Sequence, residues 1–283
     1  MTAEQCVVEV RPLDSYYTAG VQIRDHHQRA IDRLADAYRE DARFRGLIIG
    51  GSIAKGFARD DSDVDFMIIA TDAEYERRLA TRDLFINRRD LCDYEGGFVD
   101  GKIINLEFLE DVAGRGNEPS RAAFLGAFAA YSHIPGLDAL IERIPVYPEA
   151  GHDSRIKAFY SMAFIQHWLL HEAERHGNRY TLIRAASQLA LFSGRLILAH
   201  NRVLFPYHKW LPRTLAAVPA KPAGFMEYFD ALLEGPARDT ATALFKSIRD
   251  FHDWGVSDID AYTWFMTDVE WSWMADSVPI EDW

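Results

Sequence analysis

Residues 47–69 read Leu-Ile-Ile-Gly-Gly-Ser-Ile-Ala-Lys-Gly-Phe-Ala-Arg-Asp-Asp-Ser-Asp-Val-Asp-Phe-Met-Ile-Ile. The two short apolar runs at its ends, 47–49 and 66–69, are typical of buried strands. Between them lie a Gly-Gly-Ser turn, a short helical stretch and a pair of aspartates. The stretch therefore predicts strand, turn, short helix and strand, and the rest of the chain is interpreted around it.

The two aspartates, Asp63 and Asp65, are two residues apart at the start of the second predicted strand. Strand side chains alternate in direction, so we expect both carboxylates on one side. Neighbouring carboxylates repel each other unless a cation lies between them. A hard divalent metal with oxygen ligands, Mg²⁺ above all, fits this pair.

Gly50, Gly51 and Ser52 add backbone N–H groups and a hydroxyl at the start of the short helix, which suits a phosphate. Lys55 is a further candidate for phosphate contact, the alternative being a solvated lysine. A phosphate site and a metal site on adjacent strands indicate nucleotide chemistry.

The string Gly51-Ser52, ten residues, then Asp63-Val64-Asp65-Phe66 resembles the signature of the DNA polymerase β-like nucleotidyltransferase superfamily. It is most similar to the small-molecule branch, the aminoglycoside and lincosamide nucleotidyltransferases. The resemblance implies an α+β chain with a mixed sheet flanked by helices, followed by an all-α helical bundle. The alternative interpretation is a tight turn before a polar strand edge, with solvated aspartates.

Around this motif, helical spacing and turn signals predict the other N-terminal elements. Asp-Gly between apolar runs favours a hairpin. The expected elements are a helix over 14–40 opened by Asp14-Ser15, a charged helix over 70–87, a hairpin over 97–109 with its turn at Asp100-Gly101, a short helix over 120–131 and an edge strand over 144–147.

Glu107 falls in the middle of the second predicted hairpin strand, between Leu106 and Phe108. The resemblance assigns it as a third carboxylate, which would complete the metal site or act as the base. The alternative is an exposed Glu on the solvent side of an antiparallel sheet.

A break at Pro148-Glu149-Ala150-Gly151 divides the chain into a predicted catalytic domain, 1–150, and a predicted helical bundle domain, 151–283. Short connections favour antiparallel neighbours. Helices are expected over 153–176, 179–200, 223–234, 238–254 and 261–275.

Three further features carry weaker signals. By resemblance, Lys209 is a candidate for reaching the triphosphate, with a solvated Lys as the alternative. His26 and His27 point about 100° apart on a helix and are not expected to be ligands. His167 and His171, one turn apart, lack a third ligand and are expected to be packing or surface residues.

The amino-acid composition limits the kinds of protein and of binding partner to be considered. With 283 residues, 48% hydrophobic and 26% charged, the chain is typical of a globular protein of one or two domains, and its two cysteines exclude a disulfide framework. No leader or membrane span is read from the sequence, so a cytoplasmic location is expected. A net charge of −12 disfavours a long nucleic acid and favours a small molecule.

The resemblance implies transfer of a nucleoside monophosphate, AMP by preference, from a Mg²⁺-bound NTP to a hydroxyl of a small acceptor, with release of pyrophosphate. An aminoglycoside-type antibiotic is one such acceptor, and the oligomeric state stays open. Two alternatives remain: an enzyme that adenylylates a protein, such as a toxin–antitoxin component, and a non-catalytic nucleotide-binding regulator.

Overall fold

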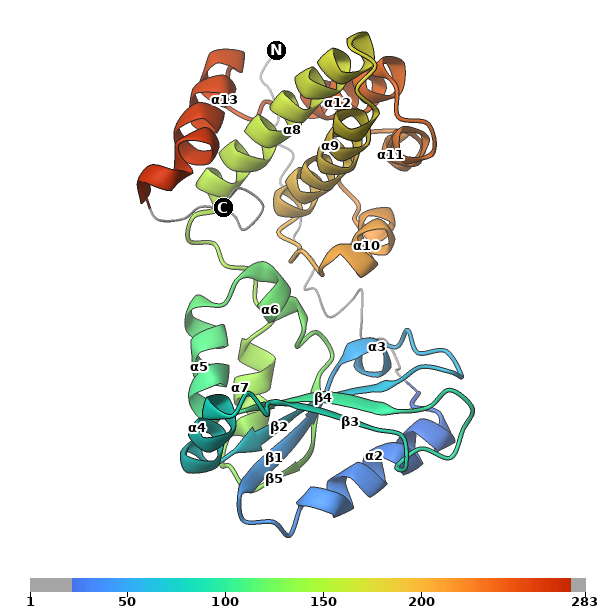
Figure 1. Cartoon of the computed structure of the whole chain (residues 1–283), viewed down its shortest axis with the longest axis vertical. Helices are drawn as coiled ribbons and strands as arrows, with labels where there is room; N and C mark the ends of the chain where they lie inside the picture. Colours follow the sequence, from blue (N-terminus) through green and yellow to red (C-terminus); the bar gives the residue numbers. More distant parts are fainter. Residues whose placement is uncertain (1–21, 276–283) are drawn as a thin grey trace, which may run out of the picture. The chain divides into compact units, whose positions relative to one another are not determined.

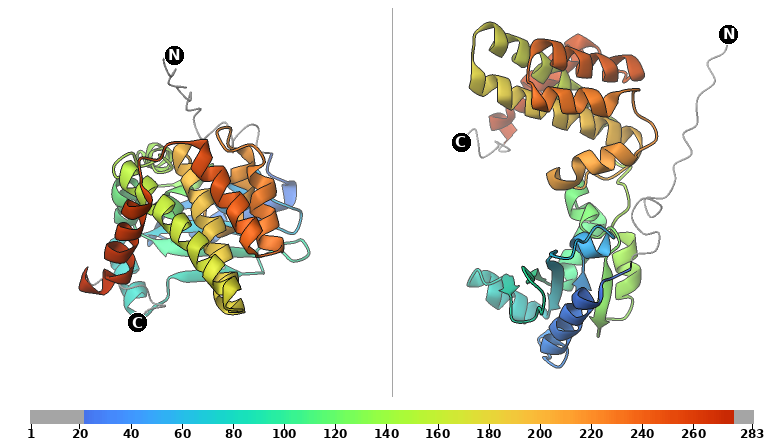
Figure 2. Two further views of the ribbon diagram at one scale, coloured as in Figure 1. Left: turned by 90° about the horizontal axis from the view of Figure 1, so that it is seen from above. Right: turned by 90° about the vertical axis from the view of Figure 1, so that its right-hand side faces the viewer.

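The computed structural model describes residues 22–275, and within them the chain forms two compact units. One unit ends at Tyr147 and the other begins at Pro148 (Figures 1 and 2). That residues 1–150 are the catalytic domain and 151–283 a bundle with its own role stays a prediction.

The N-terminal unit is a five-stranded sheet with helices on both faces (Figure 1). Three of its described helices begin with side-chain caps: Thr71 accepts from the N–H of Glu74, Asn105 from that of Phe108 and Asn117 from that of Ser120. Its elements are α2 (Asp25–Tyr38), β1 (Phe44–Ile49), α3 (Gly51–Ala54), β2 (Val64–Ala70), α4 (Asp72–Ala80), β3 (Phe85–Arg88), β4 (Val99–Ile104), α5 (Leu106–Arg115), α6 (Glu118–Ala122), β5 (Phe128–Ser132) and α7 (Leu137–Arg143).

The strand order is β3-β4-β2-β1-β5. β2 and β4 are parallel, while the other three pairs are antiparallel, so the sheet is mixed. A mixed sheet with flanking helices followed by a helical region confirms the predicted α+β class.

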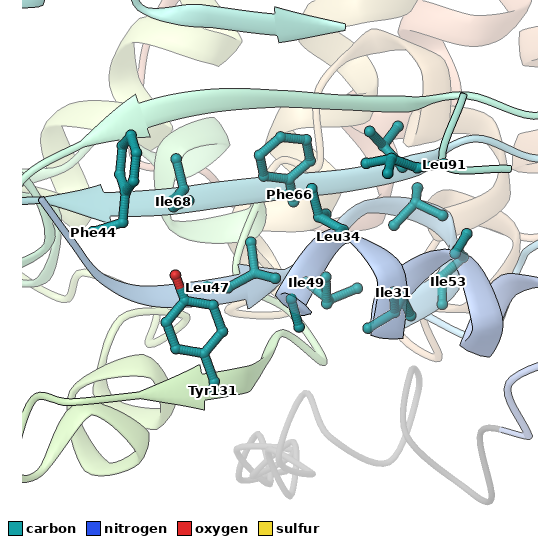
Figure 3. Close-up of a cluster of buried hydrophobic side chains, with 14 of the residues drawn as sticks. Ile31, Leu34, Phe44, Leu47, Ile49, Ile53, Phe66, Ile68, Leu91 and Tyr131 are labelled. Atoms are coloured by element: carbon teal, nitrogen blue, oxygen red, sulfur yellow. The ribbon is translucent and has the colours of Figure 1, made fainter. Parts of the chain in front are cut away.

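Apolar side chains on the two faces of the sheet form two separate cores. Leu47 and Phe66 pack with Leu34 of α2 on one face (Figure 3). Ile48 and Ile69 pack with α5 and α7 on the other face. Each fully buried side chain of this size contributes about 1.5–3 kcal/mol to stability, and burial on both faces explains why the strands of the central motif read as continuous apolar runs.

The predicted hairpin over 97–109 is wrong. Residues 99–104 form one strand, β4, which contains Asp100-Gly101 in its interior and pairs in parallel with β2. The glycine is required by packing, since a Cβ on Gly101 would lie 2.5 Å from the ring of Phe66, its neighbour on β2. What resembles a turn signal is therefore a cross-strand packing requirement.

Other N-terminal predictions fail at element ends. The helix expected over 70–87 ends at Ala80 and β3 follows. The helix expected over 120–131 is shorter, and β5 occupies its last residues. Residues 144–147 form no strand after α7. The helix expected over 14–40 is described only from Asp25, and its predicted start lies outside the described residues.

The unit from Pro148 onward is helical in its described residues, as predicted. The ranges 153–176, 179–200, 223–234 and 238–254 agree with observed helices to within about three residues. Its elements are α8 (His152–Arg175), α9 (Arg179–His200), η1 (His208–Trp210), α10 (Leu211–Ala217), α11 (Phe225–Glu234), α12 (Arg238–Phe251), α13 (Asp258–Phe265), η2 (Met266–Glu270) and η3 (Ser272–Ala275).

One helix in the described part of the chain, α9, is long and apolar enough to span a membrane by length and composition. More than half of that stretch, 56%, is buried inside the protein, and α9 contacts α8, α10, α11 and α12. An apolar helix is also what the centre of a helical bundle requires.

Candidate active site

Three carboxylates converge at one end of the sheet in the N-terminal unit. Asp63, Asp65 and Asp100 each have one oxygen within 4.8 Å of the other two. Asp63 directly precedes β2, Asp65 is the second residue of β2, and Asp100 is the second residue of β4. The cluster therefore joins the predicted pair to a residue of the neighbouring parallel strand.

The parallel register brings this third carboxylate in. Asp65 and Asp100 are directly paired between β2 and β4, and paired residues in a parallel sheet point to the same face. Their neighbours Val64 and Val99, also paired, are fully buried and turn to the opposite face. Alternation thus holds Asp65 and Asp100 side by side.

The Gly-Gly-Ser turn lies directly against this cluster. Gly51 has a φ of +62°, and a Cβ on it would lie 1.8 Å from Oδ2 of Asp65. The backbone N–H of Gly50 donates a hydrogen bond of 3.0 Å to the carbonyl oxygen of Asp65. The N–H of Gly50, predicted to bind phosphate, is therefore engaged with β2, whereas the turn as a whole adjoins the carboxylates as expected.

Ser52 is buried, with 7% of its surface exposed, and its Oγ has no hydrogen-bond partner among the described residues. An unpartnered buried hydroxyl is uncommon, because losing its hydrogen bonds to water is unfavourable. Ser52 directly follows Gly51, so this spare donor belongs to the turn that adjoins the carboxylates.

The pKa of Asp100 reflects its burial and the charge repulsion within the cluster. Burial, and then the charge of Asp63, raise the pKa of Asp100, while interactions with Asn87 and Lys102 oppose the rise. Its Oδ1 is buried and has no hydrogen-bond partner within residues 22–275. A divalent cation with oxygen ligands would relieve the repulsion and coordinate this oxygen, so the residues present fit such an ion.

Glu107 does not join this group. It is exposed and lies in the first turn of α5, where Asn105 caps the helix, so the predicted strand around it is wrong. Asp100 is near the beginning of β4 and Glu107 follows its end, a separation of roughly 15–20 Å at strand spacing. Asn105 at the cap position was the missed signal for a helix start.

The two lysines of the predicted site lie in different units. Lys55 follows α3 and is 6% exposed, so the solvated alternative is wrong for it. Lys209 lies in η1 of the helical unit, exposed, with its Nζ 5.1 Å from the centre of the Trp210 ring. Its predicted contact with phosphate stays a prediction.

Comparison with known proteins locates the match on this part of the chain. A family model described as a nucleotidyltransferase domain matches residues 31–108, which include the Gly-Ser turn and all three aspartates. No curated protein matches the sequence.

Among solved structures, a nucleotidyltransferase-like protein from Exiguobacterium sibiricum is similar over 80% of this chain and 74% of its own length, with 10% identity and a TM-score of 0.47. The family match identifies residues 31–108 as a nucleotidyltransferase domain, which supports the polymerase β-like superfamily that the Gly51-Ser52 and Asp63-Val64-Asp65 signature predicts.

Proposed function

We propose that the protein transfers a nucleoside monophosphate, AMP by preference, from an NTP to a hydroxyl group of a small molecule and releases pyrophosphate. The observation that carries the proposal is the contact between the Gly51 turn and the cluster of Asp63, Asp65 and Asp100. This contact supports the proposal because the turn that would bind phosphate adjoins the carboxylates that would hold a metal, within the residues that match a nucleotidyltransferase domain.

Asp63, Asp65 and Asp100 would hold the divalent cation, for which Mg²⁺ is the first candidate. Such an ion, when bound, neutralises charge on the phosphates and at the reacting phosphorus. Asp100 would thus take the role that the resemblance assigned to Glu107.

The chain's own groups divide the remaining work. The Ser52 hydroxyl would donate a hydrogen bond to a phosphate oxygen, which would satisfy its unpartnered Oγ. The buried Oδ1 of Asp100, which has no hydrogen-bond partner among the described residues, would bind the cation. The proton of the attacking hydroxyl would pass to a carboxylate oxygen of the cluster that does not hold the cation.

The acceptor is proposed by charge. A net charge of −12 attracts cationic molecules and repels polyanions. A cationic polyol of the aminoglycoside type satisfies both this preference and the need for a hydroxyl group, so it belongs first in an acceptor screen.

The test is an acceptor screen with α-³²P-labelled ATP, GTP, CTP and UTP and Mg²⁺, with the Asp65→Asn variant as control. We expect label to move onto a small hydroxyl compound with the wild type and not with the variant. Label on a protein band instead would favour protein adenylylation. Nucleotide binding without turnover on any acceptor would favour a regulator and contradict the proposal.

A further inference from the structure

Two loops lead into the carboxylate cluster, and both are fastened to the same helix, α2. The first loop, residues 57–62, runs from the Gly-Ser turn to Asp63. The second, residues 89–98, runs from β3 to β4 and so to Asp100. The distance between these carboxylates therefore depends on how the two loops are held.

The first loop is held through alternate backbone carbonyls. Arg24 donates to the carbonyl oxygen of Ala58 at 2.6 Å, and Nε2 of His26 donates to that of Asp60 at 3.0 Å. Arg24 also forms an ion pair of 2.7 Å with the Asp60 carboxylate. Because these bonds go to the main chain, they fix the path of the loop whatever its side chains do.

The third carbonyl in this series belongs to Ser62, the residue directly before Asp63. It accepts a hydrogen bond of 2.7 Å from the hydroxyl of Tyr94, which lies on the second loop. Burial above all raises the pKa of Tyr94, with the charge of Asp63 among the further causes, so the hydroxyl keeps its proton and acts as a donor. Tyr94 thus links the two loops one residue away from a cluster carboxylate.

Tyr94 itself is closely packed. Its ring lies 4.6 Å from the ring of His26 and 5.2 Å from that of the buried His27, centre to centre. A Cβ on Gly97 would lie 2.7 Å from the Tyr94 ring, so only glycine leaves room for the ring there. Next to it, Asp93 bonds Arg29 at 2.8 Å and Arg33 at 2.9 Å, which ties the second loop to α2 as well.

We propose that Tyr94 is a positioning residue for the carboxylate cluster: its hydrogen bond to the Ser62 carbonyl sets Asp63 relative to Asp100, and so sets the affinity for the divalent ion. The inference rests on the proposed function. It explains a pair of adjacent histidines and a loop tyrosine that the nucleotidyltransferase signature does not include. Groups that orient metal ligands commonly affect metal affinity strongly.

The test is Mn²⁺ and Mg²⁺ binding by isothermal titration calorimetry to wild type, Tyr94→Phe, Tyr131→Phe and Asp65→Asn. Tyr131 is the matched control, because its hydroxyl is also buried in this unit but has no hydrogen-bond partner among residues 22–275. We expect Tyr94→Phe to bind metal about tenfold more weakly, as the loss of one orienting hydrogen bond implies, and Tyr131→Phe to bind like the wild type.

A purely structural role would lower the Tm of Tyr94→Phe and leave its metal affinity unchanged, and that result would overturn the inference. In assays, excess Mg²⁺ should restore kcat in Tyr94→Phe but not in Asp65→Asn. If Tyr94→Phe does not fold, the same metal titration is done with His26→Ala. This variant removes the bond to the Asp60 carbonyl and the ring that packs against Tyr94. Failure of the wild type to bind metal would instead contradict the proposed function.

Discussion

At the scale of single residues, the carboxylates that would hold a metal ion also repel one another and so lower the stability of the metal-free protein. Ionised Asp100 is disfavoured in the folded chain, since burial and Asp63 raise its pKa. A carboxyl group with a raised folded pKa stabilises the fold at low pH, and this contribution is lost as the pH rises above its unfolded value of 3.8. At neutral pH without metal, Asp100 therefore destabilises the protein.

The first prediction follows from this conflict. In EDTA at pH 7, Asp100→Asn should unfold at a higher temperature than the wild type, because it removes the repulsion. Mg²⁺ should raise the Tm of the wild type, because the ion binds the folded cluster and not the unfolded chain. It should not raise the Tm of Asp100→Asn, because this variant lacks one of the three carboxylates. Nucleotidyl transfer by Asp100→Asn should fall by at least about 100-fold, as for removal of an essential electrostatic group.

Glu107→Gln is the matched control for Asp100→Asn. Glu107 is exposed on α5, beyond the opposite end of β4, so transfer by this variant should stay within about twofold of the wild type. Differential scanning fluorimetry and a pyrophosphate-release assay measure both effects. A large loss of activity in Glu107→Gln with normal activity in Asp100→Asn would reverse the assignment.

The second prediction concerns Gly51. Any other residue there is strained at a φ of +62°, and its Cβ would collide with the carboxylate of Asp65. Gly51→Ala should lower stability by about 1–3 kcal/mol and weaken metal binding, because Asp65 must move. Urea unfolding and calorimetry measure the two quantities.

Gly136 is the control that separates the effect of backbone strain from that of a steric clash. It has a φ of +75°, but a Cβ on it would meet nothing within 4 Å. Gly136→Ala should therefore show a backbone penalty of about 1–2 kcal/mol and unchanged metal binding. Equal metal affinity in the two variants would show that Gly51 does not control the position of Asp65.

Residues of the site were predictable from the sequence where the determining information is local. The pairing of Asp63 and Asp65 follows from strand alternation, and the turn at Gly51 from the local Gly-Gly-Ser sequence. Asp100 did not follow, because its place depends on the register of two strands about 35 residues apart, which no local pattern encodes. Glu107 was preferred because Leu106-Glu107-Phe108 resembles the strand that carries the family's third carboxylate. An acid between apolar residues, however, is equally compatible with the first turn of a helix.

At the scale of elements, the same limit separates helices from strands. Long helices such as α8 and α9 were predicted almost to the residue because their periodicity is local. β3, Phe85–Arg88, is short and was taken for the end of the helix predicted over 70–87. β4 was taken for a hairpin because it has a glycine in its interior. Only the Phe66 ring, from another strand, explains that glycine.

The third prediction tests this explanation. Gly101→Ala should destabilise the N-terminal unit by about 1–3 kcal/mol, as overpacking does, because its Cβ would lie 2.5 Å from the ring of Phe66. Gly114 in α5 is the control, since a Cβ there meets nothing within 4 Å. Gly114→Ala should be neutral or stabilise by up to about 1 kcal/mol, as Ala does in a helix.

Chemical denaturation followed by circular dichroism compares these two glycine variants. Phe66→Leu, introduced together with Gly101→Ala, should recover part of the loss by making room for the new methyl group. Additive effects of the two substitutions would contradict a direct contact between them.

At the scale of the whole molecule, the two units carry titrating groups that respond to different pH ranges. In the N-terminal unit, Arg77 and Arg78 hold the pKa of Glu74 at about 2, and Arg29 holds that of Asp93 at about 2. These depressed carboxyl pKa values stabilise the unit above about pH 4.5. The contribution is lost as the pH falls from there toward 2.

In the helical unit the relevant groups are histidines. Burial, followed by the charges of neighbouring histidines, lowers the pKa of His167 and of His200 to about 4. Neutral His167 lies over the ring of Phe245, and neutral His200 lies against Phe251 and Trp254. The unfolded chain binds protons at these sites from about pH 6.5 downward, so this stabilisation is lost between about pH 6.5 and 4.

The fourth prediction is that the helical unit weakens first on acidification. All seven tryptophans follow residue 150, so tryptophan emission during heating reports on that part of the chain. The unfolding temperature measured in this way should decrease as the pH is lowered from 6.5 to 4. In the double variant His167→Phe/His200→Phe it should decrease clearly less. His176→Gln is the control, because 63% of the His176 side chain is exposed. An unchanged pH dependence in the double variant would mean that other groups govern the acid response, whereas a shallower one would identify buried neutral histidines as the reason that the helical unit requires near-neutral pH.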